Sequence, residues 1–154
     1  MPNAPDNDLA RLTQPGGNYL PAVSSTGPLL HLAGQVARRG ETMLAVGLVG
    51  KDVDLELAKS CSRQCALNLL SHIRDHAGGL QTVIRVVHVG VYVAAVADFG
   101  EHSLIADAAS EVFVEALGDR GLHTRTAVGV QSLPRRSPVE VDCMVELVAA
   151  TRAH

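Results

Sequence analysis

The sequence predicts an α+β domain with the element order β-β-β-α-β-α-β-β, in which the helices pack on one face of a sheet. Three observations lead to this prediction. Apolar residues recur at helical spacing over residues 54–77 and 101–117, β-branched residues fill 83–93, and apolar residues alternate with polar ones over 139–148. Helices of this spacing between strands are typical of a sheet covered on one side.

The first strands are expected near the N-terminus. Apolar runs at 20–23 and 29–33 are separated by Ser-Ser-Thr-Gly-Pro, which predicts a hairpin turn. Gly34 follows, where a bulge or a close backbone approach is expected. A weaker third strand is predicted over 42–46. Residues 1–15 are expected to form a flexible segment, and residues 16–150 a single domain.

The first predicted helix, over 54–77, has one apolar face and ends at Gly78 and Gly79, since glycine readily adopts the left-handed conformation that closes a helix. At 100° per residue this face carries Leu55, Ala58, Ser62, Cys65, Ala66, Leu69, Ile73 and Ala77. The second helix, over 101–117, is closed by Gly118, and its apolar set is Ile105, Ala109, Val112, Phe113 and Ala116.

The chain is expected to end in two strands, over 124–130 and 139–148, joined by Leu-Pro-Arg-Arg-Ser-Pro. In the last strand valines alternate with Glu140 and Asp142, the period of a half-buried strand. The two arginines of the turn, Arg135 and Arg136, are expected in solvent.

Composition excludes several classes of function. The chain has 154 residues, a net charge of −3 and 3% aromatic residues without Trp, so it lacks the basic surface and the stacking platforms of nucleic-acid binders. It has no apolar run of about 18 residues to cross a membrane and no apolar stretch typical of a secretory signal near its polar N-terminus. The chain has three cysteines, and such a small, odd number is typical of a protein whose thiols stay reduced. We expect a cytoplasmic protein with neither nucleic-acid nor membrane partners.

Metal and nucleophile sites are poorly supported. Cys61, Cys65, His72 and His76 lie on one side of the first helix, but the stripe is about 22 Å long, too long for one tetrahedral site. Packing explains these residues better, and no metal is predicted. The chain lacks a G-x-S-x-G motif, its cysteines occupy apolar positions, and residues 47–51 lack the spacing of a phosphate loop.

Arg125, at the start of an apolar strand, is the strongest candidate for chemistry, and two explanations stay open. In the first, it is structural and pairs with a carboxylate of the protein or extends to solvent. In the second, it binds an anionic ligand, because a guanidinium holds a carboxylate through two N–H groups and keeps its charge. Glu140 is then either its partner or an acid/base group. The run 83–93 is apolar on both sides, so the uncovered sheet face is expected to be apolar and to drive self-association.

Three stretches together resemble the Rid family, the reactive intermediate deaminases, also called the YjgF family and formerly L-PSP endoribonucleases. Residues 17–23 (GNYLPAV) and 31–36 (HLAGQV) resemble G-P-Y-x-x-A-V and x-x-S-G-Q-[IV]. Residues 63–70 (RQCALNLL) resemble R-Q-A-L-x-N-L. Residues 123–128 (HTRTAV), 133–134 (LP) and 139–142 (VEVD) resemble P-A-R-[ST]-x-V, L-P and [VI]-E-[IV]-[ED]. The resemblance covers residues 16–148.

The resemblance implies a chorismate-mutase-like fold assembled as a homotrimer, with sites for a small carboxylate in the clefts between subunits. It also implies an enamine/imine deaminase that hydrolyses 2-aminoacrylate-type intermediates to 2-keto acids and ammonia, without cofactor or metal. The alternative is a non-catalytic, regulatory homotrimer that binds small carboxylates. Ribonuclease activity, the older description of the family, is disfavoured by the charge and the aromatic content.

The resemblance also assigns residues. The carboxylate-binding arginine corresponds to Arg125, the acidic residue to Glu140, the pocket tyrosine to Tyr19, and the glycine whose backbone meets the substrate to Gly34. Five positions depart from the family pattern and indicate a divergent subgroup with altered pocket chemistry. Ala33 replaces a serine, His123-Thr124 replaces Pro-Ala, Asp107 stands where a pocket asparagine is common, and Ala127 where a cysteine is common.

Overall fold

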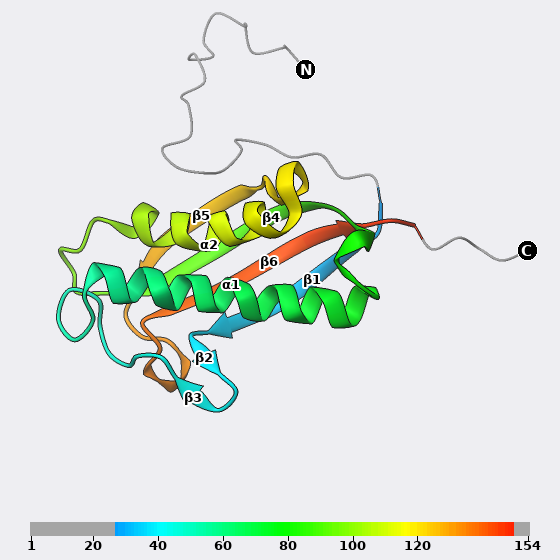
Figure 1. Ribbon diagram of the computed structural model, residues 1–154. Helices are drawn as coiled ribbons and strands as arrows, with labels where there is room; N and C mark the ends of the chain where they lie inside the picture. Colours follow the sequence, from blue (N-terminus) through cyan, green and yellow to red (C-terminus); the bar gives the residue numbers. More distant parts are fainter. Residues whose placement is uncertain (1–26, 150–154) are drawn as a thin grey trace, which may run out of the picture.

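The computed structural model describes residues 27–149, so Tyr19, the predicted strand over 20–23 and the predicted flexible segment over 1–15 lie outside the described residues. Within this range the element order is β-β-β-α-β-α-β-β (Figure 1), but the strand Arg38–Arg39 was not predicted and stands in this order in place of the strand predicted over 20–23. The elements are β1 (Leu29–Val36), β2 (Arg38–Arg39), β3 (Thr42–Met43), α1 (Leu55–Ala77), β4 (Val83–Ala94), α2 (His102–Leu117), β5 (Thr124–Val130) and β6 (Val139–Leu147).

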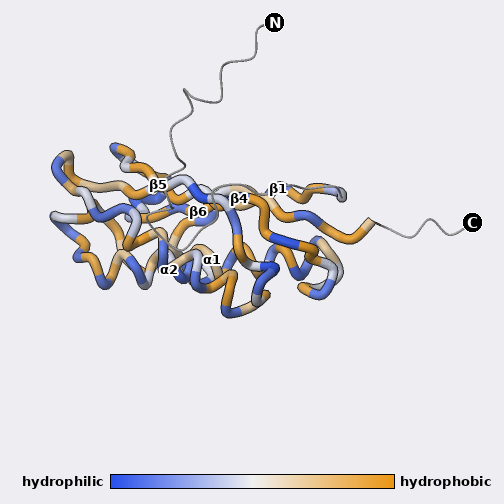
Figure 2. The backbone as a smooth tube through the Cα atoms, turned by 90° about the horizontal axis from the view of Figure 1, so that it is seen from above, coloured by the Kyte–Doolittle hydropathy of each residue, from blue (hydrophilic) through white to orange (hydrophobic). Residues whose placement is uncertain are grey.

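The main sheet is mixed. Across residues 27–149 its strands are ordered β1-β6-β4-β5, with β4 and β5 parallel and the other neighbours antiparallel. A parallel pair needs a crossover, and α2 supplies it. Figure 2 shows α1 and α2 on the same side of this sheet. The predicted α+β fold with helices on one face is therefore confirmed.

The early strands differ from the prediction. β1 continues to Val36 across a register shift between Leu32 and Gln35, so the bulge expected at Gly34 is present. The strand predicted over 42–46 is wrong in extent, because only Thr42–Met43 pairs, and it pairs with Arg38–Arg39 in a separate hairpin. The turn at Gly40, with φ of 55°, lets the chain fold back within four residues.

Helix α1 begins and ends as its sequence predicts. The side chain of Asp54 caps the helix by accepting a hydrogen bond from the Leu57 amide at 2.8 Å, and Gly78 closes it with φ of 76°. Cys61 and Cys65 are buried in the core, which confirms packing as their role. His72 and His76, for which packing was also predicted, are exposed, because in the last turns the helix lies beside the edge strand β1.

The polar residues of the 63–70 stretch fasten α1 to its neighbours. Arg63 forms a two-pronged ion pair with Glu115 of α2, at 2.8 and 3.2 Å. Gln64 accepts from Arg39 Nε at 2.8 Å and donates to Asn68, whose amide donates to the Val36 and Arg38 carbonyls. These contacts hold the bend between β1 and β2 against the helix.

The uncovered face of the sheet is not the apolar surface that the sequence predicts. In β6 the residues Val139, Val141 and Val145 are buried in the core, so the alternating Glu140 and Asp142 face away from the helices. In β4 the pattern misleads, because register shifts at 83/85 and 86/88 change which residues face the core. His88 and Tyr92 therefore lie on the uncovered face of the sheet. This polar surface differs from the apolar face that was predicted to drive self-association.

The core lies between the sheet and the helices, and consists of aliphatic residues with one aromatic ring, Phe113. In α2 the predicted apolar position Ala116 is exposed and Leu117 is buried instead, because the helix ends there. None of the described helices is both long and apolar enough to cross a membrane.

Candidate functional site

Arg125, the second residue of β5, points toward α2 and is almost completely buried, with 1% of its side chain exposed. Its Nη1 donates to Asp107 Oδ1 at 2.7 Å and to Ser110 Oγ at 3.0 Å. Asp107 and Ser110 are three residues apart in α2 and therefore lie on one side of the helix. Asp107 remains 25% exposed, so a carboxylate forms the solvent-facing end of the pair.

Behind Arg125 the polar contacts continue to His123. Its Nε2 lies 2.9 Å from Ser110 Oγ, and its Nδ1 lies 2.6 Å from the Gly121 carbonyl oxygen. A carbonyl only accepts, so Nδ1 carries the proton, Nε2 accepts from the Ser110 hydroxyl, and Ser110 Oγ accepts from Arg125. Burial, together with the nearby Arg125 charge, lowers the pKa of His123 to about 4, and the imidazole is neutral at pH 7.

Glu140 lies on the opposite face of the sheet, where Gly34 makes room for it. A β-carbon added at Gly34 would lie 2.9 Å from Glu140 Cδ and closer still to its carboxylate oxygen. No side chain fits there without displacing Glu140. The structure therefore brings together Gly34 and Glu140, which the sequence assigns to one site.

Asp142 lies two residues beyond Glu140 on the same strand face and accepts two hydrogen bonds from β4. The Gly90 amide donates to Oδ1 at 3.2 Å, and the Tyr92 hydroxyl donates to Oδ2 at 3.1 Å. Burial raises the pKa of Glu140, and the negative charge of Asp142 raises it further. Burial and the same charge raise the pKa of Tyr92, which keeps its hydroxyl as a donor.

The predicted site residues thus form two groups. Arg125 and Asp107 lie on the helix side of the sheet with Ala127, whose side chain packs against the core from the same strand face. Gly34 and Glu140 lie on the uncovered side, and β4 separates their strands from β5. Arg125 and Glu140 do not meet within one chain, and the partner of Arg125 is Asp107.

Sequence reasoning missed Ser110 and the role of His123. His123 was noted for standing where the family has proline, yet its ring fills a buried position against Phe113, with ring centroids 5.7 Å apart. Ser110 has a recognisable signal: it is a polar residue one turn after Asp107 in a helix that is otherwise apolar on this side. Thr124, the other departure, fastens β5 to β4 by donating to the Val87 carbonyl at 2.8 Å.

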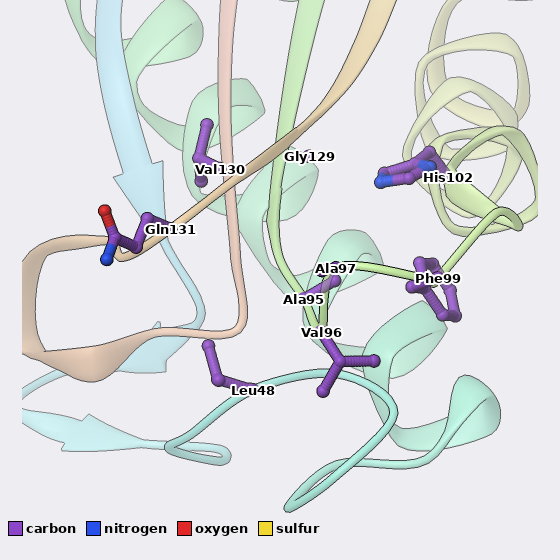
Figure 3. Close-up of a pocket in the computed structure, with 9 residues that line it drawn as sticks. All are labelled: Leu48, Ala95, Val96, Ala97, Phe99, His102, Gly129, Val130 and Gln131. Carbon is purple, nitrogen blue, oxygen red and sulfur yellow. The ribbon is translucent and has the colours of Figure 1, made fainter.

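A cavity of about 490 Å³ lies away from both groups, at the end of β5 (Figure 3). Its wall is formed by Leu48, residues 95–97, Phe99, His102 and residues 129–131. Figure 3 shows Phe99 and His102 on one side and Gln131 on the other. None of the predicted site residues that lie within 27–149 lines it. Within residues 27–149, no three His, Cys, Asp or Glu side chains are grouped so that they could hold a metal ion.

Comparisons with known proteins agree with this fold. Residues 10–147 match the family model described as Endoribonuclease L-PSP. Protein TCP17 of Trypanosoma cruzi is 36% identical over 140 residues, which cover 90% of this chain and 87% of TCP17.

Solved structures show the same architecture. Atu1372 from Agrobacterium tumefaciens, a protein with unknown function, has a TM-score of 0.76 and 36% identity, covering 88% of this chain and 85% of Atu1372. RidA from an Antarctic Psychrobacter has a TM-score of 0.52 and 26% identity, covering 87% of this chain and 92% of RidA.

Proposed function

Since the chain belongs to the Rid family, also known as the YjgF or L-PSP family, we propose that it is an enamine/imine deaminase. The proposed reaction hydrolyses 2-aminoacrylate-type intermediates to 2-keto acids and ammonia, and it uses no cofactor or metal. The observation that carries this proposal is the placement of Glu140 against the backbone of Gly34, where burial and the Asp142 charge raise its pKa above the ordinary value and favour proton uptake by this carboxylate.

The proposed site is shared between copies of the chain in a homotrimer. Arg125 and Glu140 lie on opposite faces of the sheet, so a substrate that touches both needs Arg125 from one copy and Glu140 from the next. Closed, symmetric oligomers of identical chains commonly build sites in this way. Tyr19 belongs to the proposed pocket by resemblance.

Each side chain has a defined task in the proposed reaction. Arg125 holds the substrate carboxylate and orients the protonated imine beside Gly34. Glu140 takes a proton from water as the water oxygen bonds to the imine carbon and the C=N electron pair moves to nitrogen. Glu140 then returns the proton to that nitrogen, the C–N bond breaks, ammonia leaves with the carbinol proton, and the 2-keto acid remains.

The competing proposal is a trimer that binds small carboxylates without turnover. The departures from the family pattern support it, because Arg125 and Glu140 are kept while Ala33 replaces the serine next to Gly34. Location in the cytoplasm remains a proposal, supported by three free and buried cysteines.

The test generates 2-aminoacrylate or 2-iminobutanoate in situ with a dehydratase acting on serine or threonine, and follows its decay. We expect wild type to exceed the spontaneous rate, Arg125→Ala and Glu140→Gln to approach it, and Arg74→Ala, an exposed arginine on α1, to match wild type. A wild-type rate equal to the spontaneous one on several precursors rejects the enzyme.

Mixing the two inactive variants tests the shared site. In co-expressed Arg125→Ala and Glu140→Gln chains, about one quarter of the sites combine an intact arginine with an intact glutamate, if subunits assemble randomly. Recovery of about this fraction of wild-type activity is expected. No recovery, or a sedimentation mass near the 16.2 kDa of one chain instead of about three times this value, rejects the shared site.

A further inference from the structure

We propose that Asp142 is a positioning residue for proton transfer at Glu140: fixed by the Gly90 amide and the Tyr92 hydroxyl, it places a second carboxylate beside Glu140 and so favours proton uptake there. This inference rests on the proposed function, because it assigns a task to a neighbour of the proposed acid/base residue. Asp142 itself touches no reacting atom in this scheme.

The two carboxylates share one surface. Residues two apart in a strand point to the same side and lie about 7 Å apart along it. The Glu140 side chain packs over β1 in the space left by Gly34, and the Asp142 side chain packs over β4 in the space left by Gly90. A β-carbon at Gly90 would lie 3.0 Å from Tyr92 Oη and closer to Asp142 Oδ1. One glycine on each side of β6 therefore fixes the position of one carboxylate.

Their hydrogen bonding is unequal. Asp142 accepts from an amide and from a hydroxyl, and these two donors fix the position of its carboxylate. In the part of the chain that the structure describes, no hydrogen-bond donor reaches the Glu140 carboxylate, so the nearby Asp142 charge acts on it without a compensating donor. Two nearby carboxylates in unequal surroundings commonly take different roles in proton transfer.

Among the residues that the structure describes, the titratable groups near Glu140 give the sign of the effect. Its own strand contributes Asp142, β4 contributes Tyr92 opposite it, and α1 contributes the buried Cys65. Gly34 and Val36 of β1 do not titrate. Burial is the largest cause of the raised pKa of Glu140, and the Asp142 charge is the second. Removing that charge lowers the pKa of Glu140 without returning it to its ordinary value.

Asp142→Asn is the decisive variant, because an asparagine oxygen still accepts from Gly90 and Tyr92 while the charge is lost. We expect the carboxyl carbon of Glu140, followed by NMR during a pH titration, to show a midpoint lower by roughly half to one pH unit. The acid limb of imine hydrolysis shifts down by the same amount, since Glu140 must be ionised to accept the proton. Asp75→Asn, an exposed aspartate on α1, leaves both unchanged.

Tyr92→Phe provides a second route if Asp142→Asn does not fold. It removes one of the two donors that fix the Asp142 carboxylate beside Glu140, and it produces a smaller downward shift of the Glu140 midpoint. An unchanged Glu140 midpoint in Asp142→Asn, or in Tyr92→Phe where only that variant folds, overturns the inference. A wild type without turnover rejects the proposed function alone, because the NMR titration still reports on Asp142.

Discussion

Arg125 finds its charge partner on a helix and not on the neighbouring strand: its Nη1 lies 2.7 Å from Asp107 Oδ1, with only 1% of the arginine side chain exposed. A buried guanidinium needs such a partner, because an unpaired charge in the interior is costly. A pocket asparagine, common in the family at this position, accepts the same hydrogen bond without cancelling the charge. In the proposed site, the pair therefore reduces the charge that Arg125 offers to an anion.

Asp107→Asn is expected to tighten the binding of a small carboxylate. The amide oxygen still accepts from Arg125, while the positive charge becomes available to the ligand. We expect roughly tenfold tighter binding of pyruvate by titration calorimetry. Glu111→Gln, which removes an exposed acid one turn further along α2, is the matched control and leaves affinity unchanged. Equal affinities in wild type and Asp107→Asn contradict this prediction.

Gly34→Ala is expected to displace the Glu140 side chain, because the new methyl group would occupy its place. Overpacking of this kind costs about 1–3 kcal/mol of unfolding free energy. The loss of activity should exceed what the remaining folded fraction explains. Gly100→Ala is the control, since a β-carbon there has no atom within 4 Å. Urea unfolding and the imine assay compare the variants, and a stable, active Gly34→Ala protein refutes the proposed role.

His123 is expected to make folding sensitive to acid. Its folded-state pKa is lowered to about 4, below the ordinary value of 6.5, so as pH falls the unfolded chain is protonated first. This contribution is fully present above about pH 6.5 and is lost toward pH 4, amounting to roughly 2 kcal/mol by pH 5. Urea unfolding at pH 7 and pH 5 measures it.

His123→Gln removes the titration and gives the comparison. Its unfolding free energy should fall less between pH 7 and pH 5 than that of wild type. The raised pKa of Glu140 acts in the opposite direction in both proteins and cancels in the difference. Parallel pH dependences would show that His123 does not titrate on unfolding.

The three cysteines are expected to be unreactive in the folded protein. All are buried, burial raises the pKa of Cys61 to about 11, and it raises the pKa values of Cys65 and Cys143 as well. A thiol-specific disulfide reagent at pH 8 should modify no thiol before unfolding and all three after addition of urea. Rapid modification of one native cysteine would contradict this burial.

Local chemistry made the helices predictable. Asp and Gly are residue types preferred at the two ends of a helix, as at Asp54 and Gly78, and the apolar spacing between them is regular over the whole of α1. The alternation of apolar and polar residues predicted β6 equally directly. β2 gave no such signal, since two arginines form a strand only because the turn at Gly40 returns the chain.

The uncovered sheet face and the Arg125 network depend on long-range contacts. The register shifts in β4 change which of its residues face the helices. The segment 83–93, which the sequence predicts to be apolar on both sides, therefore places His88 and Tyr92 on a polar surface. Asp107 and Arg125 are 18 positions apart, and only the crossing of β5 under α2 brings them together. The roles proposed for Arg125 and Glu140 came from family resemblance, because their spacing alone left structural pairing open.

The position of β5 at the margin of the sheet has a consequence for hydrogen exchange. An edge strand, paired on one side, is expected to open more easily than a central one, and its amides should exchange sooner than those of β4. Arg125 ties this strand to α2 through Asp107 and Ser110, so detaching β5 also breaks an ion pair. The Arg125 guanidinium therefore opposes the detachment of β5 from α2. The protection of the amides of residues 124–130 against hydrogen exchange measures how strongly it does so.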